Sequence, residues 1–430
     1  MNVLKRNLIL FCFGQFGIML LTRYLFQWLY AFGALKEESS EAVLLASATL
    51  AAFFLGFRVF DAVTDPMAGW LTAEVVRRRG SKLGLTKWVA WLAPLGLVFC
   101  FLPSFDFPPL MRWVSVLSGL TLFFVGYTLY AIPFWSLLDD LAEGNEEVKI
   151  RFSNALGIGL LLATALGFVA VPPLVHSIGY LYSALMIASV SLICMLLPQQ
   201  MRLDPLEDRS PEVPLRIGDL FKIRSDIRFL ALLCLLAGTQ MAFTIITAAA
   251  PFFAIHLLQG DEADVAYLLG PLLLVALAFL KFVPQIAFQF GSLHSIKFGV
   301  LYLALVCGLI GWIGFPRSPS VFYTASFFCC AGPALALLLG LEGDLVSSAA
   351  THGSLPLSIY FGFFNFWIKF CNGIAFAGTG MLLGEFIRTE AHTYLYATIY
   401  LAAGIPLIGL GLYYLLSWIA GRSSASSTNV

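Results

Sequence analysis

Hydrophobic residues occur in long runs along the whole chain, and short polar stretches separate these runs. The runs recur at lengths of about 20 residues, which is what a helix needs to cross the hydrocarbon core of a bilayer. Run length and flanking charges together predict twelve membrane-spanning helices. We expect them near residues 8–33, 42–72, 88–104, 109–138, 151–176, 179–199, 227–257, 264–290, 295–315, 320–348, 354–384 and 392–420.

The charges between these runs predict the orientation of the chain. Lys and Arg concentrate in the even-numbered junctions, such as "RRRGSKLGLTK" after the second run and "GSLHSIK" after the eighth. The odd-numbered junctions include acidic stretches such as "KEESSE" and "QGDEAD". Because basic loops stay on the cytoplasmic side, we expect a multi-pass protein of the cell membrane with both termini in the cytoplasm.

The longest polar stretch follows the sixth run and divides the chain into two halves. We therefore predict a six-helix half over residues 1–199, a central cytoplasmic loop over 200–228, a second six-helix half over 229–421 and a cytoplasmic tail over 422–430. Six plus six spans around a central loop is the organisation of the major facilitator fold. The predicted fold class is an all-α membrane protein of that architecture.

Composition agrees with this prediction and narrows the function. The 430-residue chain is 60% hydrophobic and 12% charged, whereas soluble domains carry about 25% charged residues. Its formal net charge of zero gives no indication of nucleic-acid binding. All eight cysteines lie in apolar runs without metal-ligand spacing, so we expect buried apolar side chains. The first run is longer than the core of a signal peptide, which predicts a retained helix.

Three ionisable residues interrupt the second run, in the stretch "GFRVFDAVTDPMAGW" over residues 56–70. The spacing of Arg58, Asp61 and Asp65 puts them on one face of a helix, which must face the bundle interior or water. Two carboxylates one turn apart repel each other unless a cation or proton lies between them. Asp61 and Asp65 are therefore predicted ligands of Na⁺, Li⁺ or H⁺. Arg58 is equally well spaced to form a structural pair with Asp61.

Other runs carry polar side chains at helical spacing, which predicts a water-accessible cavity between several helices. These stripes comprise Gln15, Met19, Arg23 and Gln27 in the first run, Gln240, Thr244 and Thr247 in the seventh, and Asn365, Lys369 and Asn372 in the eleventh. Lys281, Glu342 and Asp344 are expected to form structural or gating pairs near the membrane interface, where long side chains reach water.

Several of these stretches resemble the glycoside–pentoside–hexuronide:cation symporters of the melibiose-permease type. The similar segments are "RVFDAVTDPMAGW", "GYTLYAIPFWSLLDDLA", "RFSNALGIG", "GDLVSSAATHG" and "FNFWIKFCNGIAFA", which occur in the family's order. The resemblance implies cation-coupled uptake by alternating access. It implies that Asp61 and Asp65 bind the cation with Thr128 nearby, and that Lys369 links the cation and substrate sites. It also implies that Arg151 lies near the sugar.

The chain departs from this family where the family binds its sugar. Met19 and Ala131 occupy the positions of two sugar-binding acids, and Arg23 lies one turn from Met19. A site without those hydrogen bonds discriminates poorly for such sugars, so an anionic or zwitterionic solute is favoured, such as a hexuronide or a lipid headgroup. The predicted substrate-binding residues are Gln15, Met19, Arg23, Tyr127, Ala131, Trp135, Arg151, Asn365 and Asn372.

We therefore predict a symporter, coupled to Na⁺ or H⁺, that imports a small solute such as a sugar derivative. The alternative is a sodium-dependent carrier of lysophospholipids or other amphiphiles, which have an apolar cavity. A receptor or scaffold would need neither titratable stripe. An enzyme is not expected, because the sequence shows no nucleophile–base arrangement, metal-ligand cluster or phosphate-binding loop. The expected partners are membrane lipids and the solute, without nucleic acid or cofactor, and we expect a monomer.

Overall fold

The computed structural model describes residues 3–33, 35, 44–45, 47–79, 82–201, 217–259, 264–315, 320–351, 353 and 355–427. Over these residues the chain is helical and contains no strand. The predicted all-α class is therefore confirmed. Residues 202–216 of the predicted central loop and residues 428–430 of the predicted tail lie outside the described ranges.

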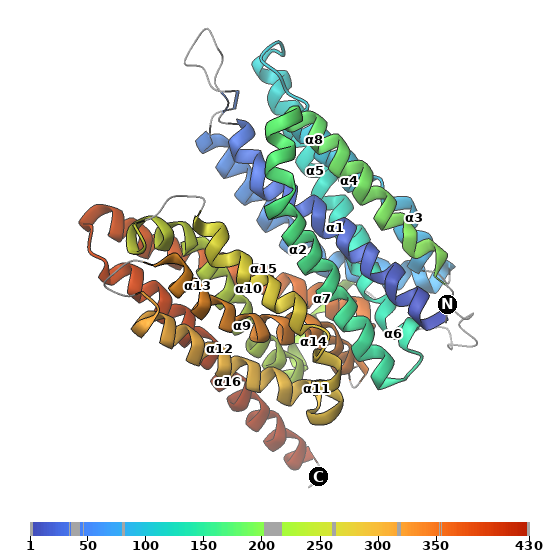
Figure 1. Cartoon of the computed structure of the whole chain (residues 1–430). Coiled ribbons are helices and arrows are strands. Elements are labelled where there is room, and N and C mark those ends of the chain that lie inside the picture. Colours follow the sequence, from blue (N-terminus) through green and yellow to red (C-terminus); the bar gives the residue numbers. More distant parts are fainter. Residues whose placement is uncertain are drawn as a thin grey trace. The chain divides into compact units, whose positions relative to one another are not determined.

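Sixteen α-helices are described, and they group into two compact units (Figure 1). Unit 1 comprises Met1–Ile217 with Pro356–Phe363, and unit 2 comprises Gly218–Leu355 with Phe364–Val430. The helices are α1 (Val3–Gly33), α2 (Ser47–Arg79), α3 (Lys82–Val89), α4 (Leu92–Phe101), α5 (Pro109–Trp135), α6 (Leu137–Ala142), α7 (Glu146–Val169), α8 (Val171–Leu196), α9 (Ile227–Phe252), α10 (Asp264–Phe279), α11 (Val283–Phe290), α12 (Ser292–Ile313), α13 (Val321–Cys330), α14 (Gly332–Thr351), α15 (Leu357–Thr389) and α16 (Thr393–Ser427).

Most of the predicted spans correspond to helices of sufficient length and hydropathy. In the described ranges ten helical segments could cross a membrane, or eleven if the bent pair α10 and α11 forms one span. The ten do not include α2, whose 33 residues hold Arg58, Asp61 and Asp65. The predicted span over 264–290 is bent by 57° between α10 and α11. The predicted span over 88–104 falls on the end of α3 and on α4.

Small residues allow the helices of unit 1 to approach closely. Figure 1 shows α4, α5 and α8 side by side, and α1 packs along α7 and α8. A Cβ atom added to Gly96 of α4 would lie 2.4 Å from the backbone nitrogen of Phe123 of α5. Such contacts are typical of membrane helices, which associate through close van der Waals packing rather than through the hydrophobic effect.

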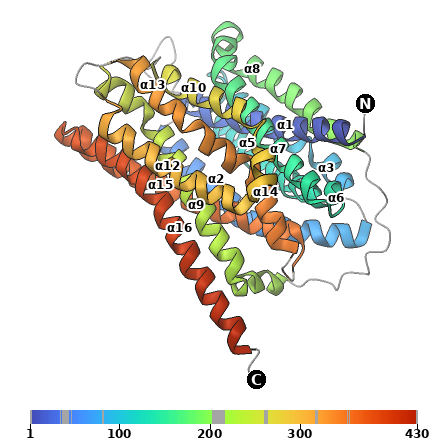
Figure 2. The same ribbon diagram turned by 60° about the horizontal axis from the view of Figure 1, so that its bottom comes forward.

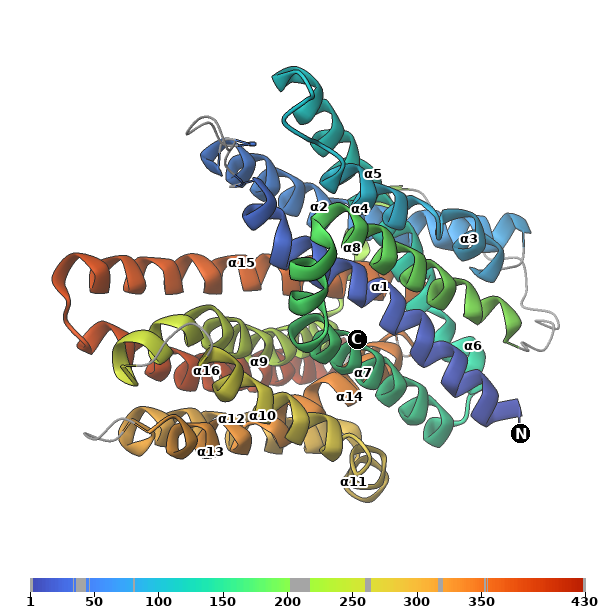
Figure 3. The same cartoon turned by 45° about the horizontal axis from the view of Figure 1, so that its top comes forward.

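Unit 2 follows the same packing principle around α9 and α16. Figure 2 shows α16 in red running to the C-terminus, and Figure 3 shows α9, α12 and α16 as neighbouring helices. A Cβ atom added to Gly409 of α16 would lie 2.6 Å from the backbone oxygen of Cys234 of α9. Two neighbouring helices of this unit, α9 and α14, carry the half-buried polar pair Gln240 and Glu342.

The first turns of α15 belong to unit 1 and cross α2 next to the two aspartates. A Cβ atom on Gly69 would lie 2.5 Å from the backbone oxygen of Ser358, and one on Gly362 would lie 2.6 Å from that of Asp65. The Ser358 hydroxyl donates a hydrogen bond of 2.8 Å to the backbone oxygen of Gly69. This crossing therefore fixes the backbone of α2 around Asp65.

We expect Gly69→Ala to destabilise the protein, because the new methyl group would collide with the backbone of α15. Overpacking of this kind costs about 1–3 kcal/mol. Gly56→Ala on the same helix is the matched control, since nothing lies within 4 Å of its added Cβ, and alanine favours helix by about 1 kcal/mol. Thermal unfolding of the purified variants measures the difference. Equal midpoints for the two variants would contradict this crossing.

Candidate functional site

Helix α2 buries both aspartates completely. The side chains of Asp61 and Asp65 are 0% exposed, and Thr128 of α5 is buried beside them. Because residues four apart lie on the same helix face, the two carboxyl groups point toward the same neighbouring helix. Pro66, directly after Asp65, has no backbone N–H to donate to the carbonyl group of Ala62. The site thus gathers acceptor oxygens in a part of the protein shielded from water.

The hydroxyl group of Thr128 connects the two carboxylates. Its Oγ1 atom lies 2.9 Å from Oδ1 of Asp61 and 3.3 Å from Oδ1 of Asp65. A hydroxyl group has one proton to donate, so it cannot give each carboxylate a full hydrogen bond at the same time. Three oxygen atoms from two helices therefore converge, and they carry more negative charge than one hydroxyl proton compensates.

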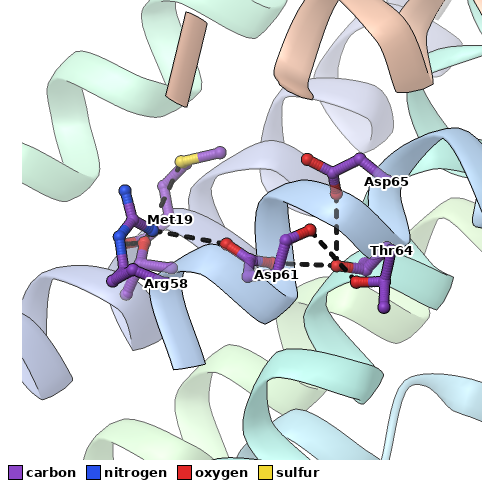
Figure 4. A network of polar contacts seen from close by, with 7 residues as sticks. Met19, Arg58, Asp61, Thr64 and Asp65 are labelled. Atoms are coloured by element: carbon purple, nitrogen blue, oxygen red, sulfur yellow. Dashed lines mark hydrogen bonds and ion pairs between the residues drawn. The ribbon is translucent and has the colours of Figure 1, made fainter. Parts of the chain in front are cut away.

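Arg58 compensates part of that charge from one turn earlier on α2. Its Nη1 atom lies 3.3 Å from Oδ2 of Asp61 (Figure 4). Its guanidinium carbon lies 4.9 Å from the centre of the Phe26 ring on α1. The structural pair that the sequence spacing allowed is therefore formed. Thr64 donates its hydroxyl proton to the backbone oxygen of Asp61 at 3.0 Å, so this proton does not serve the carboxylates. Cation–π contact with Phe26 holds Arg58 beside Asp61.

Four of the predicted substrate-binding residues lie in one region of unit 1. The indole nitrogen of Trp135 donates a 2.7 Å hydrogen bond to Oε1 of Gln15. The rings of Tyr127 and Trp135 meet edge to face at 6.4 Å, and Trp135 also contacts the ring of Phe361 at 6.4 Å. Ala131, fully buried, precedes Trp135 by about one turn on α5. The region is an aromatic surface with one fixed amide.

Met19 and Arg23 continue this surface along α1. Met19 is half-buried, and its backbone oxygen accepts a 2.7 Å hydrogen bond from the hydroxyl of Thr22. Arg23 is also half-buried, and in the described part of the chain it forms no ion pair with a carboxylate. Gly167 of α7 provides space for it, since a Cβ there would lie 3.2 Å from Cβ of Arg23. Among the described residues, no carboxylate therefore neutralises the Arg23 guanidinium group.

The remaining predicted substrate and coupling residues belong to α7 and α15. Arg151 is exposed in the second turn of α7, in unit 1. Asn365, Lys369 and Asn372 belong to the part of α15 in unit 2. Nδ2 of Asn365 and Oδ1 of Asn372 are buried and have no hydrogen-bond partner among the described residues. These two amides therefore keep unused hydrogen-bonding capacity within the membrane-spanning part of α15.

The predicted structural or gating charges of unit 2 differ in their surroundings. Glu342 of α14 accepts a 2.9 Å hydrogen bond from the side-chain amide of Gln240 of α9. Asp344 is buried, whereas Lys281 is exposed at the break between α10 and α11, with its ammonium nitrogen 4.6 Å above the ring of Phe282. Sequence spacing assigns Gln240 to a polar stripe and Glu342 to the structural or gating charges, and does not predict that they meet. It also missed Phe26 and Thr64, although Thr64 follows Asp61 by a helical spacing of three.

The donor set suits a monovalent cation. Within the described ranges no group of three or more His, Cys, Asp and Glu side chains is arranged to hold a metal ion. Two carboxylates and a hydroxyl are hard oxygen donors, which prefer hard cations over soft transition metals. The assignment of Asp61 and Asp65 as ion ligands remains a prediction, and the observed geometry is compatible with it.

We expect Thr128→Val to destabilise the protein, because the isosteric side chain keeps the packing and removes the only proton that Thr128 gives to the carboxylates. Hydrogen bonds to charged groups contribute about 1.5–3 kcal/mol. Thr128→Ser keeps the hydroxyl and is the matched control. Thermal unfolding at neutral pH compares the two. If the valine variant unfolds at the same temperature as the serine variant, the hydroxyl bridge has no energetic role.

Comparison with known proteins agrees with this architecture. A structure of the proton:xylose symporter XylE, a major facilitator superfamily protein bound to 6-bromo-6-deoxy-D-glucose, has a TM-score of 0.70 at 12% identity, covering 96% of this chain and 95% of that one. The human organic anion transporter MFSD10 (TETRAN) has a TM-score of 0.69 at 13% identity, with 97% and 100% covered. An outward-facing bacterial homologue of the iron transporter ferroportin has a TM-score of 0.70 at 12% identity, with 97% and 100% covered.

Identities this low show that the fold is shared. They do not show that any substrate is shared. A search among curated proteins found no significant match. The sequence itself matches the family described as MFS/sugar transport protein over residues 14–393, which is most of its length. The helical architecture, the solved structures of similar fold and this match agree, and the chain belongs to the MFS/sugar transport protein family of the major facilitator superfamily.

Proposed function

We propose that this protein is a symporter that couples the uptake of a small solute to Na⁺ or H⁺ by alternating access. The observation that carries the proposal is the convergence of Asp61, Asp65 and the Thr128 hydroxyl in a fully buried position. A transporter that only facilitated diffusion would not need two buried carboxylates one turn apart. The resemblance of α2 and α5 to glycoside–pentoside–hexuronide:cation symporters supports the same assignment.

Charge balance explains how an ion would act at this site. Asp61 and Asp65 together carry two negative charges when ionised, and Arg58 supplies one positive charge to Asp61. A monovalent cation or a proton bound between the two carboxylates would reduce their mutual repulsion. The resemblance to cation symporters implies that Lys369 links ion binding to solute binding, and we propose this coupling role for it.

Arg23 supports an anionic solute. It is a half-buried guanidinium on a membrane-spanning helix, it forms no ion pair in the described part of the chain, and it shares α1 with Gln15. A buried cation of this kind is costly unless an anion meets it. A carboxylate on the solute would be bound by two parallel hydrogen bonds, while Tyr127 and Trp135 cover apolar faces of the solute. We therefore favour a sugar derivative with an acidic group, such as a hexuronide.

An apolar groove beside the carboxylates supports a second candidate. The groove runs between α2 and α5 with a volume of about 230 Å³ and reaches Thr128. Its lining is almost entirely apolar and comprises Thr64, Met67, Ala68, Trp70, Leu71, Val125, Thr128 and Leu129. An alkyl chain would fit such a surface, so a lysophospholipid or another amphiphile with an anionic headgroup is the alternative solute. Competition between a hexuronide and a lysophospholipid in one uptake assay distinguishes the two.

We propose that the protein works as a monomer in the cell membrane, with both termini in the cytoplasm and no cofactor other than the coupling ion. The basis for the proposed orientation is the distribution of Lys and Arg between the loops. A cysteine-accessibility label placed in the exposed Lys87 region of α3 tests the orientation, because an impermeant reagent should reach it only from the cytoplasmic side.

We expect Asp61→Asn and Asp65→Asn each to abolish ion-stimulated uptake in proteoliposomes, because either change removes one of the two charges that hold the ion. Asp106→Asn, which changes an exposed acid in the loop before α5, is the matched control and should leave uptake unchanged. Size-exclusion profiles confirm folding. If both site variants take up solute with the ion dependence of the parent, the carboxylates do not couple transport.

We expect Arg23→Gln to weaken binding of an anionic solute strongly and Arg23→Lys to weaken it less, because lysine keeps the charge and loses the two-pronged geometry. Loss of a charged hydrogen bond of about 1.5–3 kcal/mol corresponds to roughly a 10- to 100-fold rise in apparent KM. The control solute is a neutral galactoside, which the parent should carry poorly. Efficient galactoside uptake by both the parent and Arg23→Gln would rule out the anionic-solute assignment.

A further inference from the structure

Unit 2 contains a half-buried acid, Glu342, that the proposed cation site does not use. Glu342 lies in the middle of α14, ten residues after Gly332 and nine before Thr351, which places it about 15 Å from either end of the helix. The helix is part of the membrane-spanning segment Val321–Thr351. An ionisable side chain at this depth is rare and has a functional reason by default.

The partner of this acid is neutral. Oε2 of Glu342 accepts a hydrogen bond of 2.9 Å from Nε2 of Gln240, a residue about 18 Å along α9 from Arg228. Among the described residues no Lys, Arg or His nitrogen lies within ion-pair distance of Glu342, in contrast to Asp61 with Arg58. One amide N–H does not offset the desolvation of a full negative charge.

The helices that pack against α14 supply no buried charge that would change this balance. These helices are α9, α10, α11, α12 and α13. Apart from cysteines and tyrosines, their charged or titratable groups lie near helix ends or breaks. They are Arg228 in α9, His256 in the turn after it, Asp264 in α10, Lys281 between α10 and α11, and His294 and Lys297 in the first turns of α12. On α14 itself the other acid is Asp344. Because it follows Glu342 by two residues, its side chain lies on a different face of the helix. Lys369 of α15 is the remaining cation within a spanning segment of unit 2.

From this geometry we propose that Glu342 is a proton-binding site of unit 2, protonated at neutral pH and held in position by Gln240. A primary amide suits both forms of the acid, because its N–H donates to the carboxyl group and its oxygen can accept the carboxyl proton after rotation. When the carboxyl group is exposed to water, its O–H bond breaks, the proton passes to water and a carboxylate remains. The site goes beyond the proposed ion site of unit 1 and does not depend on it.

Protonation of Glu342 would make transport sensitive to pH independently of the Asp61–Asp65 pair. A carrier whose α14 changes its exposure would bind the proton on one side of the membrane and release it on the other. Neutralising Glu342 would then remove this pH sensitivity and leave the response to Na⁺. Because the proposed proton belongs to the Glu342 carboxyl group, its presence is measurable without any transport.

Infrared difference spectroscopy on the purified protein in lipid nanodiscs tests the proposal. We expect the carbonyl band of a buried protonated carboxyl group at neutral pH, lost in Glu342→Gln and retained in Asp344→Asn. The band should also persist in the double variant Asp61→Asn with Asp65→Asn. That variant separates this site from the proposed ion site, because a failure of the symport mechanism leaves the Glu342 band unchanged.

Gln240→Leu provides a second test that does not remove the acid. Loss of the amide N–H should shift the same band to higher frequency, since a carbonyl group without a hydrogen bond vibrates faster. A spectrum in which Glu342→Gln retains the whole band overturns the proposal. So does a band that disappears in the Asp61 and Asp65 double variant, or one that Gln240→Leu does not move.

Discussion

The cost of burying two like charges on one helix face governs the structure of unit 1. Asp61 and Asp65 are fully shielded from water, and each would be unstable there without compensation. Thr128 brings a hydroxyl group from α5, and Arg58 brings a positive charge that Phe26 of α1 holds in place. Three helices, α1, α2 and α5, thus contribute side chains around the two buried carboxylates. It is at these two carboxylates that we propose a cation binds.

Close helix packing gives this polar site its geometry. Gly69 and Gly362 bring α2 and the start of α15 into backbone contact directly beside Asp65, and the Ser358 hydroxyl ties the two helices together. Larger side chains at these two positions would separate the helices and move the carboxylate. The same crossing brings Phe361 onto Trp135, whose indole is fixed by Gln15. The proposed ion site and the predicted solute-binding residues Gln15 and Trp135 are therefore held by the same helix crossing within unit 1.

The sequence was sufficient to predict the helical architecture and the acidic pair, because both follow from local periodicity. Spacing alone put Arg58, Asp61 and Asp65 on one face, and the structure shows Arg58 on Asp61. Contacts between distant residues could not be obtained in this way. Gln240 and Glu342 are 102 positions apart, and nothing in the pattern of either helix indicates that their side chains meet. The resemblance to known symporters named Thr128, whereas the hydroxyl bridge itself required coordinates.

The positions of helix breaks also could not be predicted from the hydrophobic pattern of the sequence. An unbroken apolar run predicted one helix over 264–290, yet the chain bends by 57° at the position of Lys281. The sequence also placed Lys281 near the membrane interface, while the structure puts it at this break against Phe282. Likewise, the run over 88–104 extends from the end of α3 into α4. Local hydropathy does not encode such bends, because both straight and bent helices bury the same apolar residues.

The most direct test of the central claim is the thermal stability of the purified protein, measured across pH in Na⁺, Li⁺ and a large organic cation. A ligand that binds the native state stabilises it by mass action. If Asp61, Asp65 and Thr128 form one ion site, then Na⁺ or Li⁺ raises the unfolding temperature, and this rise shrinks as protons compete for the same carboxylates at lower pH. Stability that is indifferent to Na⁺, Li⁺ and pH, or ion and proton effects that simply add, would contradict the account.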